Sequence, residues 1–374
     1  MTIAAHISLT GGIFNLQDNF NYRCFSLLAT RYPEHQFVFL FDRPVPAGII
    51  SAGNVISKHV APSISNNLLQ YYWYQVRLPA VLKKYHVDFF AGNGPVCITG
   101  TNIRQGIEIN DLSFLDKRNG YNAREARYLK KRIGKFIDNA AVVAVASRQM
   151  AGAVKALNPD AGDKIHITGR GLPGKPLVIE DMVLQQFKTD HTDGKEFFLA
   201  LINEPGMGNT TALLKAFSIF KKRQLSKMKL VLLVSATYKA EIVPDYKNYK
   251  YRDDVIIIKN ENNSSGHICI AAAYAAMYFP EYFSREENLL LPLMYAVPLI
   301  TGSDNLQAGI YDGNALYCQP AAQQVAEKMM LLYKDEDLRN SLAANYRQLA
   351  TSCTWEQAAS NLWASITGSA SQTA

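Results

Sequence analysis

The 374-residue sequence lacks any apolar run long enough to cross a bilayer, which takes about 20 consecutive apolar residues. It also lacks cysteines at metal-site spacing. Its five cysteines are scattered along the chain, at positions 24, 97, 269, 318 and 353. An odd number of cysteines in apolar surroundings predicts buried free thiols in a reducing compartment, so a disulfide scaffold and a zinc site are both disfavoured.

Clusters of charge are equally scarce. Charged residues make up 19% of the chain, hydrophobic residues make up 48%, and the formal net charge is +7. The only basic runs are "KKRIGK" (130–135) and "KKRQ" (221–224), and each fits the solvent face of a helix. Nucleic acid is disfavoured as a partner, because no basic cluster alternates with aromatics in a recognisable module. The positive excess fits either a solvated surface or attraction to anionic ligands or an anionic membrane face.

The opening residues also do not match the pattern of a signal peptide. The opening "MTIAAHISLTGG" has no basic region before its apolar residues and is typical of a first strand. We therefore expect a cytoplasmic protein, with peripheral contact at the inner membrane face left open.

Strand and helix patterns alternate along the whole chain. Apolar runs such as "HQFVFLFD" (35–42) and "AVVAVAS" (141–147) are separated by amphipathic segments such as 123–140. The alternation restarts at "EFFLALIN" (196–203), and "NALYCQP" (314–320) predicts a late edge strand. This alternation predicts an α/β fold of two doubly wound parallel sheets, with ligands at the carboxyl ends of the strands. The aromatic stripe in 68–85 is more typical of a helix packed in the core than of a sugar-stacking platform.

The expected domains follow from this pattern. Residues 1–177 form an N-terminal Rossmann-like domain, and the polar stretch 178–195 is an irregular linker. Residues 196–354 form a C-terminal Rossmann-like domain. Residues 355–374 form a last helix, which could pack back on the N-terminal domain, and a tail.

Two glycine-containing turns are candidate phosphate sites. Gly11 and Gly12 follow the first strand, where backbone N–H groups can approach a phosphate or sugar, or where a tight turn can simply require glycine. "EPGMGNTT" (204–211) places Gly206, Gly208 and Asn209 before a helix, and Asn209 or Thr210 is a candidate N-cap. This turn can cradle a phosphate without a cation, or serve only as a cap. It is not a Walker loop, since the Gly-Lys-Ser/Thr ending is missing.

Further candidates lie at other strand ends. Ser284 and Arg285 precede a predicted helix, and Glu286 and Glu287 stand in its first turn, where carboxylates favour the helix dipole. Helix capping and solvation are the alternatives to ligand binding there. Asn110 and Asp111 end a strand, either as ligand contacts or as a turn-forming pair. Weaker candidates for cleft or phosphate contacts are Lys259, His267, and Arg170 or Lys175.

Several ordered segments resemble the retaining glycosyltransferases of family 4. "FFLALINEPGMGNTTALLKAF" resembles that family's strand, phosphate turn and helix, and "LLLPLMYAVPLITGS" is similar to its donor-site helix and next strand. "GIEINDLSFLD" resembles its acceptor segment. The resemblance implies the GT-B fold, with two facing Rossmann-like domains and an interdomain cleft. It also implies that 1–177 is the acceptor-side domain and 196–354 is the nucleotide-sugar-side domain. It also implies a nucleotide-sugar donor, a glycan or lipid-linked acceptor, no metal and no separate cofactor.

The sequence departs from this family where the ligand is expected. The family's carboxylate pair falls near Phe283 or Ser284 and near Leu291 or Pro292. Its phosphate-turn Arg and Lys are replaced by Met207 and Gly208, and its His-Asp-Leu reads Asn110-Asp111-Leu112. Each lost charge-assisted contact is worth roughly 1.5–3 kcal/mol.

These departures leave more than one functional hypothesis. The first is a retaining hexosyltransferase of polysaccharide biosynthesis, in which Asn110 and Asp111 orient the acceptor and the turn at 206–209 and the helix start near Glu286 stabilise the leaving diphosphate. The second is an inactive GT-B pseudo-enzyme that binds or supports an active partner glycosyltransferase. A sugar epimerase or phosphorylase of the same architecture is the third.

Overall fold

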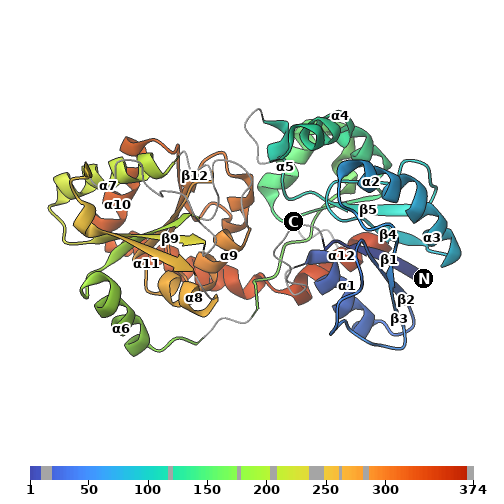
Figure 1. Ribbon diagram of the computed structural model, residues 1–374, viewed down its shortest axis with the longest axis horizontal. Coiled ribbons are helices and arrows are strands. Elements are labelled where there is room, and N and C mark those ends of the chain that lie inside the picture. The colour runs from blue at the N-terminus through green and yellow to red at the C-terminus, as the bar shows by residue number, and fades with distance from the viewer. Residues whose placement is uncertain are drawn as a thin grey trace. The chain divides into compact units, whose positions relative to one another are not determined.

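The computed structural model describes the chain except for residues 10–18, 117–120, 175–177, 203–208, 236–247, 261–262, 281–285 and 369–374. The chain divides into two compact units (Figure 1). Unit 1 comprises Met1–Gly171 and Cys353–Ala374, and unit 2 comprises Leu172–Ser352. Each contains one parallel sheet with helices against it, so the predicted pair of doubly wound α/β sheets is confirmed.

Unit 1 is built on a seven-stranded sheet in the order β3-β2-β1-β4-β5-β6-β7. Every pairing is parallel; Ile3, for example, lies opposite both Phe37 and Phe89. Strands β4 and β6 are apolar throughout, and β2 is apolar after Gln36, because helices cover both faces of such a sheet. The strands are β1 (Thr2–Ile7), β2 (Gln36–Phe41), β3 (Val55–His59), β4 (Phe89–Ala91), β5 (Arg104–Glu108), β6 (Val142–Val145) and β7 (Ile165–Ile167).

The helices of unit 1 begin where the sequence offers a capping side chain. Asn19, Asn122 and Ser147 each accept a hydrogen bond from a backbone N–H in the first turn that follows. The last helix, α12, packs against α1 in the same core cluster, through Trp355, Ala358 and Leu362 (Figure 1). The helices are α1 (Phe20–Arg31), α2 (Asn67–Tyr72), α3 (Leu78–Lys84), α4 (Ala123–Asn139), α5 (Arg148–Leu157) and α12 (Trp355–Thr367).

The aromatic segment forms one continuous helical stretch with a π-helical turn, Trp73–Arg77, between α2 and α3. Trp73 and Tyr74 are fully buried, which confirms the core interpretation for them. Tyr71 and Tyr72 are 40% and 41% exposed, so that interpretation is wrong for the other half of the stripe. The aromatic run Tyr71–Tyr74 occupies four consecutive helical positions, which span a full turn, so only part of it can face the core.

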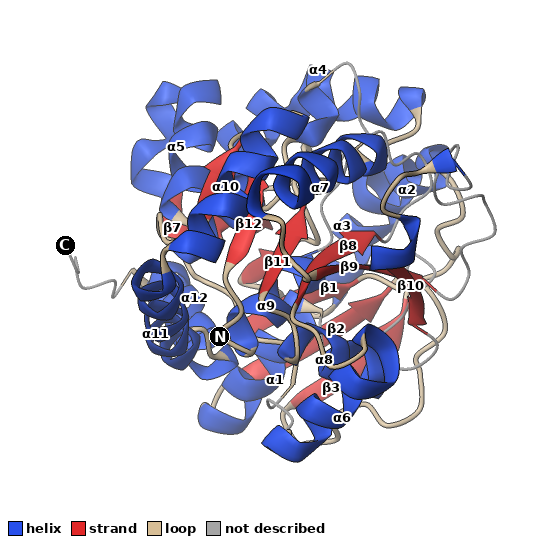
Figure 2. Ribbon diagram, turned by 90° about the vertical axis from the view of Figure 1, so that its left-hand side faces the viewer, coloured by secondary structure: helices blue, strands red, loops and turns tan. Residues whose placement is uncertain are grey.

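Unit 2 is built on a six-stranded parallel sheet in the order β10-β9-β8-β11-β12-β13, with β13 at an edge as predicted. Helices α7 and α10 lie side by side over it (Figure 2). The strands are β8 (Phe197–Ile202), β9 (Lys229–Ser235), β10 (Val255–Asn260), β11 (Ala275–Tyr278), β12 (Leu299–Gly302) and β13 (Leu316–Cys318). The helices are α6 (Asp181–Thr192), α7 (Thr210–Gln224), α8 (Asn263–Ala271), α9 (Glu286–Met294), α10 (Ala322–Lys334) and α11 (Glu336–Ser352).

Helix α6 corrects the prediction of an irregular linker over 178–195. Phe187 is buried, and its ring lies 6.1 Å from that of Phe197 and 4.5 Å from that of His191. Lys188 forms a 2.6 Å ion pair with Glu196 at the start of β8. The stretch looked irregular because the helix buries a narrow face, so its composition is mostly polar.

All five cysteines are free, and four of them are buried, as the scattered spacing predicted. Burial raises the pKa of Cys97 to about 12 and that of Cys318 to about 11, so both remain protonated at neutral pH. Among the described helices, none combines the length and the apolar character needed to cross a membrane.

Candidate functional site

In each sheet, the strand order reverses beside the first strand, between β1 and β4 in unit 1 and between β8 and β11 in unit 2. Loops leave the two strands toward opposite faces there, which makes this edge the usual ligand position in a doubly wound sheet. An asparagine side chain at the start of the next helix bonds to a strand-end carbonyl at both places. Asn21 donates to the carbonyls of His6 and Gly92, each at 3.0 Å, and Asn209 donates to that of Phe279 at 2.8 Å.

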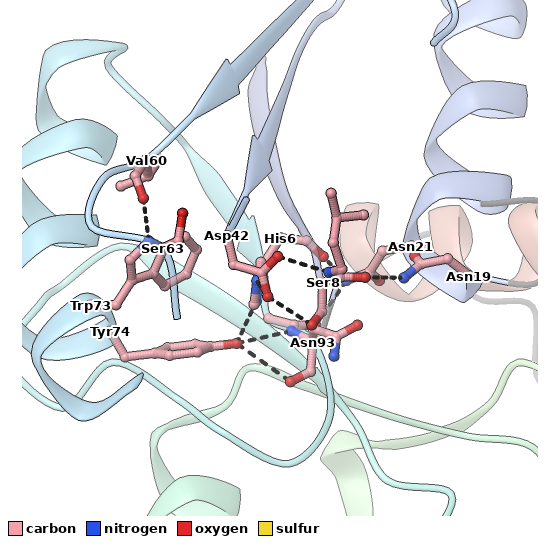
Figure 3. Close-up of polar contacts among 12 residues, drawn as sticks. His6, Ser8, Asn19, Asn21, Asp42, Val60, Ser63, Trp73, Tyr74 and Asn93 are labelled. Carbon is pink, nitrogen blue, oxygen red and sulfur yellow. Dashed lines mark hydrogen bonds and ion pairs between the residues drawn. The ribbon is translucent and has the colours of Figure 1, made fainter. Parts of the chain in front are cut away.

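A buried polar network stands beside this edge in unit 1 (Figure 3). His6 Nδ1 and the Tyr74 hydroxyl share a 2.7 Å hydrogen bond, and His6 Nε2 lies 3.6 Å from an Asp42 carboxylate oxygen. Asp42 also accepts hydrogen bonds from the Ser8 hydroxyl, at 2.9 Å, and from the Leu9 N–H, at 2.7 Å. The network therefore ties the segment that leaves β1 to the end of β2.

The electrostatics of this network are set by competing effects. Burial of Asp42 disfavours its charged form, but attraction to His6 and the hydrogen bonds from Leu9 and Ser8 outweigh it and lower the pKa of Asp42 below its usual value. Burial raises the pKa of Tyr74, so its hydroxyl stays neutral. Asp42 is 0% exposed, and we infer that it positions the backbone and does not contact a ligand directly.

Asn110 and Asp111 follow β5 at the same edge of this sheet. The Asn110 amide donates to Glu108 Oε1 at 2.6 Å, and its Oδ1 accepts the N–H of Ala146 at 2.8 Å, so it links the ends of β5 and β6. The Asp111 carboxylate accepts from the N–H and the hydroxyl of Ser113 and, at 2.7 Å, from the hydroxyl of Tyr121. The bond from the Ser113 N–H matches the turn-forming alternative for Asp111, whereas Asn110 makes a cross-strand link.

Arg170, a weaker candidate for a phosphate contact, forms a 3.2 Å ion pair with Glu108. Its guanidinium also lies 5.7 Å from the centre of the Trp355 ring. Both partners of the ion pair are largely buried, with side chains 16% and 14% exposed. The positive charge of Arg170 is thus balanced within unit 1.

The predicted donor-site residues of unit 2 are only partly within the described chain. Asn209 directly precedes α7, but its side chain makes no capping hydrogen bond and binds the Phe279 carbonyl instead. Glu286 and Glu287 begin α9, which places both in its first turn, as predicted. Gly11, Gly12, Gly206, Gly208, Ser284 and Arg285 lie outside the described residues, as does Lys175.

Helix α9 is apolar beyond its first turn. All residues from 288 to 294 are buried, and Leu291 is 7% exposed. Leu291 and Pro292 occupy the expected position of the family's second carboxylate, so this part of the helix packs into unit 2 and offers no ionised group.

Two weaker candidates in unit 2 have ordinary surroundings. His267 Nδ1 shares a 2.7 Å hydrogen bond with the Tyr295 hydroxyl, and burial lowers the pKa of His267, which favours the neutral ring. Lys259 lies within β10. Across the described residues, no group of three or more His, Cys, Asp or Glu side chains is arranged to hold a metal ion.

The sequence did not identify His6, Asp42, Tyr74 or Asn21 as members of a network. Polar residues at the ends of β1 and β2 were a usable signal, since the carboxyl ends of parallel strands share one edge. Tyr74 was hidden in the aromatic stripe.

No family model and no curated protein sequence matches the chain. Its fold does match solved structures. A glycosyltransferase from Rickettsia africae has a TM-score of 0.66 and 13% identity, with 98% of each chain covered. WaaG, a glycosyltransferase involved in lipopolysaccharide biosynthesis, has a TM-score of 0.64 and 14% identity over 98% of this chain and all of its own. A complex of Staphylococcus aureus MnaA with UDP has a TM-score of 0.58 and 11% identity, covering 98% of this chain and 96% of its own. At such identities the likeness establishes architecture, and the chain therefore has the GT-B fold of these glycosyltransferases.

Proposed function

We propose that the protein is a glycosyltransferase-like protein that takes a sugar from a nucleotide-sugar donor and delivers it to a polysaccharide or lipid-linked glycan acceptor. The observation that carries the proposal is the likeness to glycosyltransferases over 98% of the chain, which includes both sheets. The UDP bound to a third protein of this fold supports a nucleotide as the donor's leaving group.

The donor would bind at the reversal point of the unit 2 sheet. Helix α7 follows β8 and α9 follows β11, so both helices begin at the carboxyl edge of that sheet. Unpaired N–H groups and the positive end of the helix dipole at such a helix start attract a diphosphate and stabilise charge on the leaving group. Asn209 would act as a positioning residue by holding the start of α7 to the end of β11.

Asn110 and Asp111 would orient the acceptor at the carboxyl edge of the unit 1 sheet. Asn110 can donate and accept hydrogen bonds, but an amide cannot carry a proton between groups. The amide side chain of Asn110 therefore favours a role in orienting the acceptor over a role as a general base. In an active enzyme we expect transfer with retention of anomeric configuration, without a metal or a separate cofactor.

A second function, as an inactive partner of another glycosyltransferase, is favoured by helix α9. Its second and third turns are buried and apolar. A carboxylate that binds the ribose would have to project from these turns toward the ligand. The side chains of Asn110 and Asp111 are also engaged in bonds within unit 1.

Calorimetric titration of the full chain with UDP-, GDP-, ADP- and CMP-sugars tests the proposal. We expect one nucleotide class to bind and Asn209→Ala to weaken it about tenfold, a loss typical of one positioning hydrogen bond. The matched control is Asn340→Ala, at an exposed position of α11. Binding with release of nucleoside diphosphate on adding acceptor glycans supports an active enzyme. Failure of every nucleotide to bind, with co-purification of a second glycosyltransferase, supports the inactive partner instead.

A further inference from the structure

Helix α4 carries an unusual share of the positive charge of the protein. Six of its residues are Lys or Arg and two are acidic, which gives a formal charge of +4 in a chain whose total is +7. Arg124, Arg127, Lys131 and Lys135 are exposed and follow one another at spacings of three and four, so they lie on one face of the helix.

The two acidic residues of α4 offset part of this charge. Glu125 is half-buried and bonds to the Asn122 side chain at the helix start. Burial raises the pKa of Glu125, which reduces its tendency to carry a charge. Asp138, in the last turn, accepts a 2.7 Å hydrogen bond from the Asn158 side chain. It is exposed and follows Lys135 by three residues, so it lies on the same face and offsets one of the four exposed cations.

Exposed apolar and aromatic side chains adjoin the basic face. Tyr71 and Tyr72 of α2 are 40% and 41% exposed, and Val76 in the π-helical turn is 53% exposed. The α2 label stands next to that of α4 in Figure 1, and the ring centres of Tyr71 in α2 and Tyr128 in α4 are 6.4 Å apart, edge to face. The Arg132 guanidinium lies 5.5 Å from the Tyr71 ring and 5.4 Å from the Tyr128 ring, which joins the two sets into one surface.

We propose that this α2–α4 face, formed by Tyr71, Tyr72, Val76, Arg124, Arg127, Tyr128, Lys131, Arg132 and Lys135, docks the protein on a lipid bilayer that contains anionic phospholipids. Basic side chains near such a surface are attracted to its negative potential. Tyrosine rings and an aliphatic side chain can enter the headgroup region, because they have an apolar body and, in tyrosine, a polar tip.

The mixed chemistry favours a bilayer over a nucleic acid or a soluble polyanion. Attraction to phosphate or sulfate groups alone explains the arginines and lysines, but it gives no use for Val76, which is more than half exposed. An interfacial helical surface needs both parts, a basic rim and apolar groups that become buried on contact.

The docking face is also connected to the candidate acceptor loop. Tyr121, just before the Asn122 cap of α4, donates a 2.7 Å hydrogen bond to Asp111. A bilayer bound to this face would therefore lie near the loop that carries Asp111, the candidate acceptor loop. Docking does not require turnover, so it is tested separately from the proposed transfer reaction.

Co-sedimentation of the full chain with lipid vesicles tests the inference. We expect binding to phosphatidylcholine vesicles that contain about 30% phosphatidylglycerol, little binding to pure phosphatidylcholine, and release as salt rises from about 0.1 to 0.5 M. Changing Arg124, Lys131 and Lys135 together to Gln should weaken binding about a hundredfold, since each basic residue contributes roughly fivefold. The matched control changes three exposed cations of unit 2, Lys222, Arg223 and Lys227, to Gln and should change binding less than about threefold.

A second variant separates a bilayer from other anions. Tyr72→Ser with Val76→Ser should weaken vesicle binding about tenfold while leaving its salt dependence in place. The inference is overturned if the protein ignores anionic vesicles, or if the α4 variant and its unit 2 control bind alike. It is also overturned if heparin or duplex DNA binds as tightly as the vesicles and the Tyr72/Val76 variant behaves as the natural sequence does.

Discussion

The contact between Trp355 and Gly171 offers the sharpest test of how unit 1 is held together. Trp355 is 5% exposed, and a Cβ placed on Gly171 would overlap its indole ring. The guanidiniums of Arg23 and Arg170 each lie 5.7 Å from the centre of that ring. Gly171 ends the first segment of unit 1 and Trp355 stands near the start of the second, so this contact joins its two separate segments.

The expected changes in the free energy of unfolding follow from the side-chain volume that each substitution removes or adds at this contact. Trp355→Ala removes a buried indole together with its cation–π contacts and should lower the free energy of unfolding of unit 1 by about 4 kcal/mol. Gly171→Ala adds one methyl group where the ring already packs and should cost about 1–3 kcal/mol. Gly171 is not in the left-handed backbone region, so this cost comes from the overlap.

Denaturant unfolding followed by tryptophan fluorescence measures the effect on the correct unit. All three tryptophans, at positions 73, 355 and 363, belong to unit 1, and two of them remain after Trp355→Ala. The matched control is Gly152→Ala on α5, where a Cβ meets no atom within 4 Å. We expect this control to be neutral or to stabilise by up to about 1 kcal/mol.

A double-mutant cycle then decides whether the overlap is the cause. If Gly171→Ala destabilises by pushing on the ring, its cost should fall below about 0.5 kcal/mol in the Trp355→Ala background. Equal costs in both backgrounds would refute the reasoning. So would a Trp355→Ala protein within about 1 kcal/mol of the natural stability.

Three further predictions concern the polar groups at the two sheet edges. Asp42→Asn should destabilise unit 1 by about 2 kcal/mol at neutral pH. The pKa of Asp42 is lowered in the folded state, so the stabilisation that it gives is present above about pH 4 and is lost as the pH falls through the folded-state pKa. Denaturation at a series of pH values should show the unfolding free energies of the two proteins converging in acid. Tyr74→Phe should cost about 1–3 kcal/mol, measured in the same way, because it removes the 2.7 Å bond to buried His6; an unchanged denaturation midpoint would contradict this. Asn209→Ala should cost about 1 kcal/mol in unit 2, seen in the far-ultraviolet circular dichroism transition, because it leaves the Phe279 carbonyl without its side-chain donor.

The architecture was predictable because buried parallel strands leave a strong pattern. The run Phe197–Ile202 is apolar at every position, and the structure buries every one of these residues. Helix α6 was not predictable from the same rule, since Phe187 is one of few apolar residues that it buries. The π-helical turn at Trp73–Arg77 was also hidden, because it depends on local hydrogen bonding and not on a change in composition.

The polar network was only partly predictable. His6 and Asp42 lie at the ends of neighbouring strands, but Tyr74 is far from both in the chain, and only the packing of the Trp73–Arg77 turn brings its hydroxyl to 2.7 Å from His6 Nδ1. The position of Asn110 and Asp111 at a strand end made them site candidates, but it could not show that the Asn110 amide links Glu108 to the backbone of Ala146.

The two switch-point asparagines show why polar residues at a ligand-binding edge need a structural explanation first. At a reversal of strand order, the neighbouring strands send their chains to opposite faces, and carbonyl groups beyond the last ladder bond need a donor. A side-chain amide at the start of the first helix has two N–H donors and can reach such carbonyls, as Asn21 does in unit 1. Asn209 makes the corresponding bond in unit 2, although the sequences around the two residues differ. The fold itself therefore favours asparagine at both places, whether or not a nucleotide-sugar binds.

For this reason the binding titration with Asn209→Ala must be paired with the stability measurement on the same variant. A loss of binding in a variant that stays folded at the assay temperature would point to a role of Asn209 in ligand binding, whereas parallel losses of binding and stability would point to a role in the fold.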